Sequence, residues 1–250
     1  MRLIKSISFC GINFHNIRFC DIERMFGKKK ILICVPSGPG LASIYQDHNY
    51  KRSLMNSDIN IFDSGLFTLL LKINGIGVVK YSGPLLFKNL IEYFKKNHVD
   101  SYIMIDPSEI ETVTNALYMQ THTLKSKIKS YVAPIYDFNN VKDYDLLNLL
   151  NTQKPKFIII NLGSGIQEKL GAWLKRKLNY RATIICIGAA ISFQTGKQAF
   201  IPNYIDRLYL GWLARCIDKP STFIPRYFKA FKFVKIFLEN KKNIKVLYRI

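Results

Sequence analysis

The chain is short of acidic residues. Its 250 residues include 17 Asp and Glu against 37 Lys and Arg, which gives a formal net charge of +20. A charge of this sign favours anionic partners, namely nucleic acid, phosphorylated small molecules or the anionic surface of a membrane. A plainer explanation stands beside it, in which lysine simply fills solvated surface positions along the chain.

Cysteine and histidine are too few and too scattered for a metal site or a disulfide framework. The five cysteines and four histidines form no CxxC pair and no metal-ligand spacing. Cys34 and Cys186 lie inside apolar runs, and we expect them to be small buried side chains. We therefore predict no metal and no cofactor, and a reducing, cytoplasmic compartment.

Long hydrophobic runs are also missing. Charged and polar residues interrupt the N-terminal segment too often for a signal sequence. The apolar stretch from residue 183 to residue 193 is too short to span a bilayer. We expect a protein that is soluble or bound to a membrane surface, with enough hydrophobic residues (48%) for one large domain.

Apolar strands alternate with helical patterns along most of the chain. Strands are predicted at 30–36, 59–62, 101–105, 131–135, 157–160 and 182–187, and helices at 41–55, 66–73, 87–97, 109–121, 141–151 and 170–178. Polar turns with glycine separate them. This order predicts an α/β fold, Rossmann-like, with a mostly parallel sheet and flanking helices.

The composition changes in the C-terminal fifth of the chain. Residues 203–250 hold eleven Lys and Arg against three acidic residues, with aromatic residues interleaved. A basic, aromatic-rich helix over 223–238 is typical of a membrane-surface anchor. Packing of its aromatic side chains on the main domain is an equally open interpretation. We divide the chain into an α/β domain, residues 1–200, and a helical, membrane-associating C-terminal appendage, residues 201–250.

The candidate active site lies in the segment IIINLGSGIQEK, residues 158–169. A β-branched run ends there in a turn with two glycines, followed by Gln167 and Glu168. Ligands of parallel α/β sheets bind beyond the carboxyl ends of the strands, where glycine lets the backbone approach them. We therefore expect Gln167 and Glu168 at the active site.

Three blocks of sequence resemble the WecG/TagA/CpsF family of bacterial glycosyltransferases. The first is NSDINIFDSGLF (56–67), and the second is GSGIQEKLGAWL (163–174), which is similar to the family's G-x-P-x-QE block. The third extends from GAAISFQTGKQAFIP (188–202) through LGWLAR (210–215) to PSTFIPRY (220–227). The order and spacing of the blocks hold over nearly the whole chain.

The resemblance implies an inverting, metal-independent transfer of a sugar from a UDP-sugar to a polyprenyl-diphosphate-linked acceptor. This reaction serves cell-surface polysaccharides (capsule, O-antigen, exopolysaccharide or teichoic acid) and occurs at the inner face of the bacterial plasma membrane. The family's proposed general base falls on Asp63, and a carboxylate at a strand end can accept the proton of an attacking hydroxyl. Without the resemblance, an N-cap of the next helix is the more ordinary role for Asp63.

The resemblance places the other candidates around the donor. Arg215 and Arg226 are expected at the diphosphate, where guanidinium groups offset the charge of the leaving UDP. Contact with lipid headgroups or a surface ion pair is their alternative role. The remaining substrate-binding candidates are Ser37, Gly65, Gly163, Gln167 and Glu168. The resemblance implies that Gln167 lies near the nucleotide or the sugar, and a structural role is the alternative for Glu168.

The sequence departs from the family pattern at several positions. Ser64 stands between Asp63 and Gly65, Gly165 replaces a proline, Phe200 an arginine and Gly211 a glutamate. These changes indicate a divergent member and keep open a weakly active or inactive scaffold in a polysaccharide-assembly complex. A nucleic-acid-binding protein is disfavoured because no such motif is found. The donor sugar, the acceptor sugar and homo-oligomerisation stay open.

Overall fold

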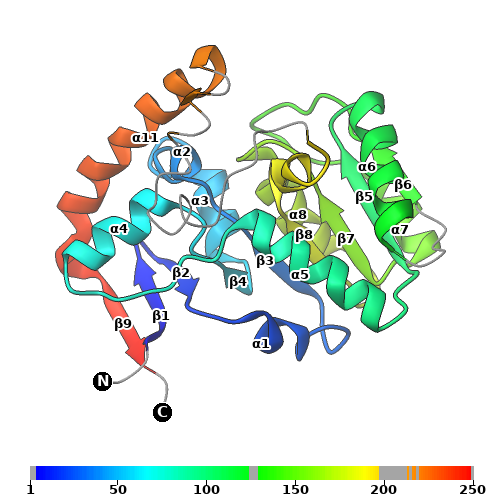
Figure 1. The fold of residues 1–250 in the computed structure, drawn as a ribbon, viewed down its shortest axis with the longest axis horizontal. Coiled ribbons are helices and arrows are strands. Elements are labelled where there is room, and N and C mark those ends of the chain that lie inside the picture. Colours follow the sequence, from blue (N-terminus) through cyan, green and yellow to red (C-terminus); the bar gives the residue numbers. More distant parts are fainter. Residues whose placement is uncertain (1–3, 124–128, 197–212, 214–215, 218–219, 249–250) are drawn as a thin grey trace.

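The computed structural model describes residues 4–123, 129–196, 213, 216–217 and 220–248 of the chain. These residues form a six-stranded sheet in the order β4-β3-β8-β7-β5-β6 and a three-stranded sheet in the order β2-β1-β9 (Figure 1). The strands of the large sheet are β3 (Ile31–Cys34), β4 (Ile59–Asn60), β5 (Tyr102–Asp106), β6 (Lys129–Val132), β7 (Phe157–Ile160) and β8 (Thr183–Cys186). The helices are α1 (Phe19–Glu23), α2 (Gly38–Leu41), α3 (His48–Met55), α4 (Gly65–Ile73), α5 (Gly83–Lys96), α6 (Glu109–His122), α7 (Tyr144–Gln153), α8 (Ile166–Lys177), η1 (Gly188–Phe193), α11 (Pro220–Asn240) and η2 (Lys241–Asn243).

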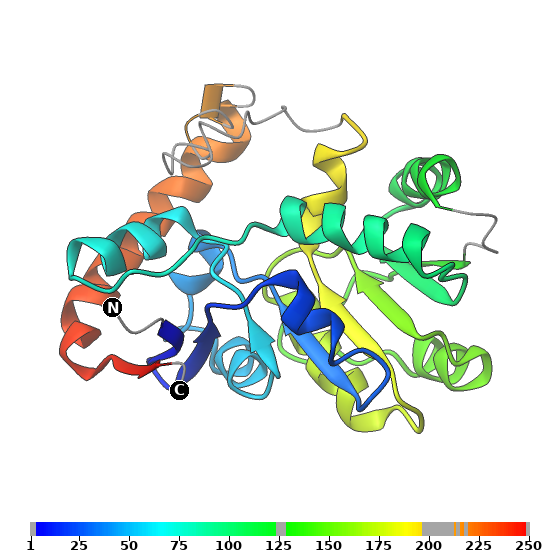
Figure 2. The same cartoon turned by 60° about the horizontal axis from the view of Figure 1, so that its bottom comes forward.

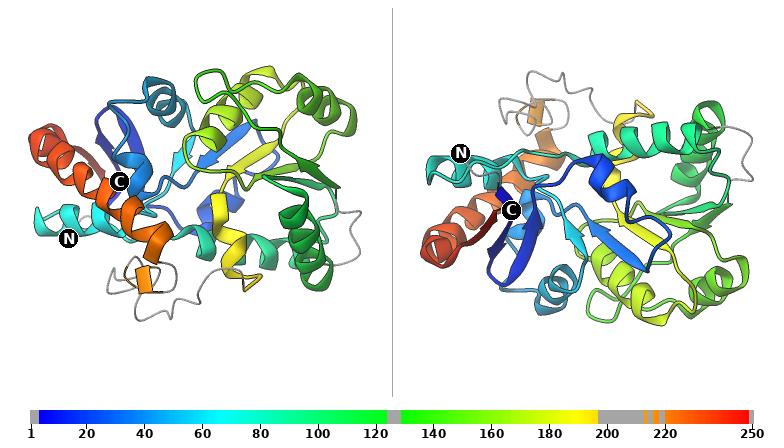
Figure 3. Two further views of the ribbon diagram at one scale, coloured as in Figure 1. Left: turned by 90° about the horizontal axis from the view of Figure 1, so that it is seen from above. Right: turned by 90° about the horizontal axis from the view of Figure 1, so that it is seen from below.

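The large sheet is parallel throughout, and helices cover both of its faces. Strands β3, β5, β7 and β8 are buried along their whole length, as continuous apolar runs predict for a sheet covered on both sides. Alternate strand residues enter two different cores, one with α3, α7 and α8 and the other with α1, α5 and α6. Figure 3 shows α3 and α8 on one side of the sheet and α5 on the other. The predicted Rossmann-like α/β fold is confirmed.

One predicted helix is wrong. A single helix was expected over 41–55, but the chain forms the short α2, a turn, and then α3. Asp47 begins α3, where its carboxylate accepts a hydrogen bond from the Tyr50 backbone N–H (2.9 Å). Asp47 also lies 2.6 Å from the Lys169 ammonium. A helix cap that is also ion-paired fixes the break at this residue.

The sequence analysis missed the small antiparallel sheet, formed by β1 (Ile4–Phe9), β2 (Ile12–His15) and β9 (Lys245–Tyr248). Cys10 and Gly11 both have positive φ (52° and 82°), which suits the two-residue turn between β1 and β2. Strand β9 pairs with the other edge of β1. The described ends of the chain therefore lie side by side (Figure 1).

The C-terminal helix α11 packs into the same core as the N-terminal strands. The fully buried rings of Phe233 and Phe237 lie 5.7 Å from the ring of Phe9, and Phe67 lies 5.2 Å from Phe233. Figure 2 shows α11 beside α4 and the small sheet. Some aromatic side chains of the basic C-terminal segment, Phe233 and Phe237, therefore pack on the main domain, as one of the two interpretations predicted. The division at residues 200/201 stays a prediction, because residues 197–212 lie outside the described part.

Among the helices in the described part of the chain, none combines the length and the apolar character needed to cross a bilayer.

Candidate active site

The candidate site lies at the carboxyl ends of β3, β4, β7 and β8. Because these strands are parallel, the turns that follow them meet at one edge of the sheet. These turns carry the predicted residues Ser37, Asp63 and Gly163, and Gln167 is the second residue of α8, the helix that follows β7.

Asp63 is held by the N-terminus of α5. Its Oδ1 accepts a hydrogen bond from the backbone N–H of Gly83, the first residue of α5, at 2.9 Å. The partial positive charge of a helix N-terminus stabilises a carboxylate in this position. Asp63 does not cap the following helix, because Ser64 does so, accepting from the Phe67 N–H at 3.3 Å. The cap interpretation is therefore wrong for Asp63, and the carboxylate points toward a different element.

Ser37 begins the short helix α2 beside the Asp63 turn. Its hydroxyl oxygen accepts from the Gly40 N–H at 3.4 Å, which is a weak cap. The turn after β3 packs closely against the turn after β4. A methyl group added at Gly38 would lie only 3.1 Å from the Ser64 hydroxyl oxygen. The structure thus brings Ser37 close to the turn that holds Asp63 and Gly65, the first residue of α4.

Gln167 and Glu168 are buried at the start of α8, and both bond to protein groups. The Gln167 Oε1 accepts from the Gly188 N–H at 2.7 Å, and its Nε2 donates to Glu168 Oε1 at 3.0 Å. The other Glu168 oxygen accepts from the Gly165 N–H at 2.7 Å. The pair therefore ties the turn after β7 to the turn after β8.

Burial changes the acidity of Glu168. Its side chain is completely buried, and this desolvation raises its pKa from 4.5 to about 7, against the opposing effect of its hydrogen bonds. A carboxyl group at the edge of the site thus changes its charge near neutral pH.

The segment after β8 contacts Gln167 directly and Gly83, the hydrogen-bond partner of Asp63. Gln167 bonds to Gly188, and a methyl group added at Gly83, the partner of Asp63, would lie 3.4 Å from Ala190 Cβ. The turn after β8 therefore links the candidate base to the QE block.

The remaining predicted residues are only partly placed. Gly163 starts the turn before α8, and its carbonyl oxygen accepts from the Ile166 and Gln167 N–H groups. Arg226 belongs to α11, but its side chain is not among those described. Arg215, Phe200 and Gly211 lie outside the described residues.

Sequence analysis missed a second buried polar group, around Asp106 at the end of β5. Its Oδ1 accepts from the side-chain amides of Asn161 (2.6 Å) and Asn115 (2.7 Å), and burial raises the pKa of the carboxyl. Asn161 directly follows β7, the strand beside β5. The sequence did carry a signal for this group, because Asp106 and Asn161 are each a polar residue at the carboxyl end of an apolar strand.

Metal binding finds no support among the described side chains, since no three His, Cys, Asp or Glu residues there are placed to hold an ion. Metal independence stays a prediction.

Fold and site together define a Rossmann-like α/β protein with a polar site at the carboxyl edge of its parallel sheet. The model of the glycosyl transferase WecG/TagA/CpsF family matches residues 7–246, and the chain therefore belongs to this family. The resemblance of the three sequence blocks is confirmed, and membership supports a glycosyltransferase of cell-surface polysaccharide synthesis. A search of curated proteins finds no match.

Proposed function

We propose that the protein transfers a sugar, with inversion and without a metal, from a UDP-sugar to a polyprenyl-diphosphate-linked acceptor. The observation that carries the proposal is the position of Asp63 in a chain matched by the family model. Asp63 lies at the carboxyl edge of the sheet, where the Gly83 N–H fixes its carboxylate, and the side chain of the next residue, Ser64, lies against the Ser37 turn. A base that is oriented before substrate binds loses little freedom in the reaction.

The proposed step is a single displacement. The acceptor hydroxyl oxygen attacks the anomeric carbon, Asp63 accepts its proton, and the bond from that carbon to the UDP oxygen breaks. The bonding electrons leave with UDP, and the configuration at the anomeric carbon inverts. Arg215 and Arg226 are proposed to offset the negative charge that develops on the diphosphate.

Gln167 and Glu168 are proposed to shape the donor side of the site. Since their side chains bond to Gly188 and Gly165, they fix the turn after β7 and the turn after β8. Gly163 has open space around it, which leaves room for the substrate at the same edge, and Gly65 is proposed to lie beside the substrate.

Membrane association is proposed to involve an outward face of α11. Four exposed apolar side chains follow helical spacing along it: Ile224, Phe228, Phe231 and Leu238. Phe228 and Phe231 are 75% and 55% exposed, and they point away from the buried Phe233 and Phe237. Exposed lysines at 229, 232 and 235 accompany this face. Aromatic and basic residues together suit the anionic inner surface of a bacterial plasma membrane.

Donor binding tests the proposal directly. The melting temperature of the full chain is measured with UDP, UDP-sugars, ADP and GDP, without added metal. A rise with UDP and with one UDP-sugar, but not with ADP or GDP, supports it. No rise with any nucleotide, with lipid vesicles absent or present, contradicts it.

A further inference from the structure

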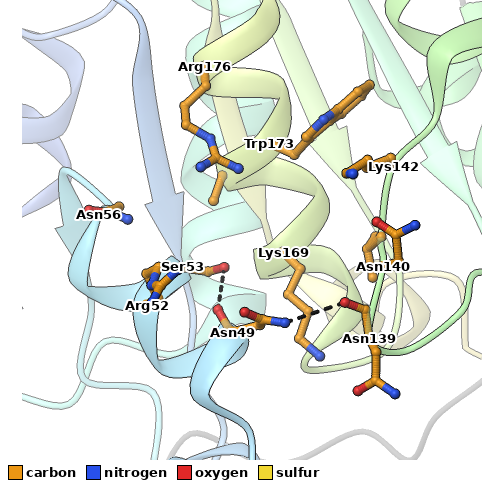
Figure 4. Close-up of a pocket in the computed structure, with 12 residues that line it drawn as sticks. Asn49, Arg52, Ser53, Asn56, Asn139, Asn140, Lys142, Lys169, Trp173 and Arg176 are labelled. Atoms are coloured by element: carbon orange, nitrogen blue, oxygen red, sulfur yellow. Dashed lines mark hydrogen bonds between the residues drawn. The ribbon is translucent and has the colours of Figure 1, made fainter.

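A pocket lies between α3 and α8, on one face of the large sheet (Figure 4). It encloses about 170 Å³. Its polar lining comes from three separate segments: Asn49 and Arg52 of α3, Arg176 of α8, and Asn139, Asn140 and Lys142 before α7. Val141, Ala172 and Trp173 supply its apolar part.

The pocket carries an excess of positive charge. Its lining includes four cations and no carboxylate. Lys169 is neutralised by Asp47 at 2.6 Å. Arg52, Lys142 and Arg176 have no carboxylate within 4.0 Å among the described side chains.

Two acidic side chains that are close to the pocket residues along the chain have partners of their own. Asp58 pairs with Lys29 (3.1 Å) and Lys175 (2.6 Å). Asp143 accepts from the hydroxyls of Tyr131 and Tyr136 (2.9 and 2.8 Å). Three cations therefore share a concave surface, where charges of one sign reinforce each other's field.

The walls of the pocket are tied together. The Asn49 side-chain amide donates to the Asn139 carbonyl oxygen (3.4 Å), and the Lys169 ammonium donates to the Phe138 carbonyl oxygen (2.8 Å). The Trp173 ring packs edge-on against Tyr144 with ring centroids 5.4 Å apart. The pocket thus has a preformed wall with amide groups beside the cations.

The Arg176 end of the pocket lies away from the candidate active site, whereas Lys169 at its other end directly follows Glu168. Helix α8 begins at Ile166, at the carboxyl edge, and Arg176 lies ten residues further along. At 1.5 Å per residue this is about 15 Å from that edge. A ligand at Arg176 therefore lies along the helix layer and not at the turn that holds Asp63.

We propose that this pocket is a second binding site, for the phosphate group of a phosphate ester or diphosphate. Guanidinium groups bind phosphate oxygens through paired N–H donors, and side-chain amides add neutral donors. A group with two or three negative charges matches the three uncompensated cations better than a single carboxylate does. The phosphate is carried either by a free nucleotide or by a lipid headgroup, and the proposal does not depend on the transferase activity.

Fluorescence of Trp173 tests the site. The chain has two tryptophans, so the change Trp212→Phe leaves Trp173 as the only reporter. Sodium diphosphate is titrated into this full-length protein. We expect a saturable change in emission, with affinity at least tenfold weaker in Arg52→Gln/Arg176→Gln. The control Lys95→Gln/Lys96→Gln removes the same charge from exposed positions on α5 and keeps the affinity.

The result that overturns the proposal is equal affinity in the pocket variant and the control, or no change in emission at all. Melting curves verify that both variants fold, which is expected because all four side chains are exposed. Competition then identifies the source of the phosphate. Displacement of diphosphate by UDP supports a free nucleotide, and displacement by vesicles of anionic phospholipid supports a lipid headgroup.

Discussion

Replacing Glu168 by glutamine should change how stability depends on pH. The side-chain carbonyl oxygen of the new glutamine can still accept from the Gly165 N–H, but its amide nitrogen cannot accept from Gln167 Nε2, so the variant removes the charge and that hydrogen bond. The lost hydrogen bond lowers stability equally at every pH, and only the removed charge changes how stability depends on pH. In the wild type, burial raises the Glu168 pKa from 4.5 to about 7. The folded state therefore holds this proton more tightly than the unfolded state, and its contribution to stability is fully present below pH 4.5 and lost as the pH rises through 7.

The size of the effect follows from the shift. A difference of about 2.5 pKa units at 1.36 kcal/mol per unit gives about 3 kcal/mol, most of it between pH 5 and pH 8. Urea denaturation at both pH values measures the free energy of unfolding. We expect the wild type to lose about 2–3 kcal/mol relative to Glu168→Gln over this range. The exposed Glu92→Gln is the control and should follow the wild type. A constant difference between Glu168→Gln and the wild type would refute the reasoning.

The remaining predictions concern the core, a turn and the membrane. Phe237→Ala empties a buried aromatic position and should lower the free energy of unfolding by about 3–5 kcal/mol in urea, whereas a loss below about 1 kcal/mol would mean that α11 is not part of the core. Gly165→Ala places a side chain at φ 92° and should lower the free energy of unfolding by about 1–3 kcal/mol. Gly163→Ala, with open space around it, should lower it much less. Equal melting temperatures of the two variants would contradict the turn geometry. Phe228→Ser/Phe231→Ser should abolish sedimentation with anionic vesicles at an unchanged melting temperature, and retained binding would remove α11 from the membrane surface.

Much of the large sheet could be predicted from the sequence because its strands are continuous apolar runs. Strand β7 has the predicted bounds, 157–160, and the QE block begins the helix that follows it. The small sheet could not be predicted in this way. Its strands join the two ends of the chain, and nothing local to β9 indicates that it pairs with β1.

The sequence indicated where the candidate site lies, but not which residues hydrogen-bond to Asp63 and Gln167. Strand ends and glycine turns indicated the edge where Asp63 and Gln167 lie. Their partners Gly83 and Gly188 are 20 and 21 residues away in the chain and carry no side chain to signal the contact. The departure at Gly165 has a physical reason that only the structure supplies: its φ of 92° excludes proline, and its N–H binds Glu168.

Asp63→Asn tests the central claim most directly. The asparagine oxygen can still accept from the Gly83 N–H, so the fold should be kept, but the side chain can no longer accept a proton. Release of UDP from a UDP-sugar is measured with a polyprenyl-diphosphate-linked sugar as acceptor, and the exposed Asp100→Asn is the control. The account predicts that kcat falls about 10²- to 10⁴-fold in Asp63→Asn and stays unchanged in Asp100→Asn. A rate near that of the wild type in Asp63→Asn would contradict it.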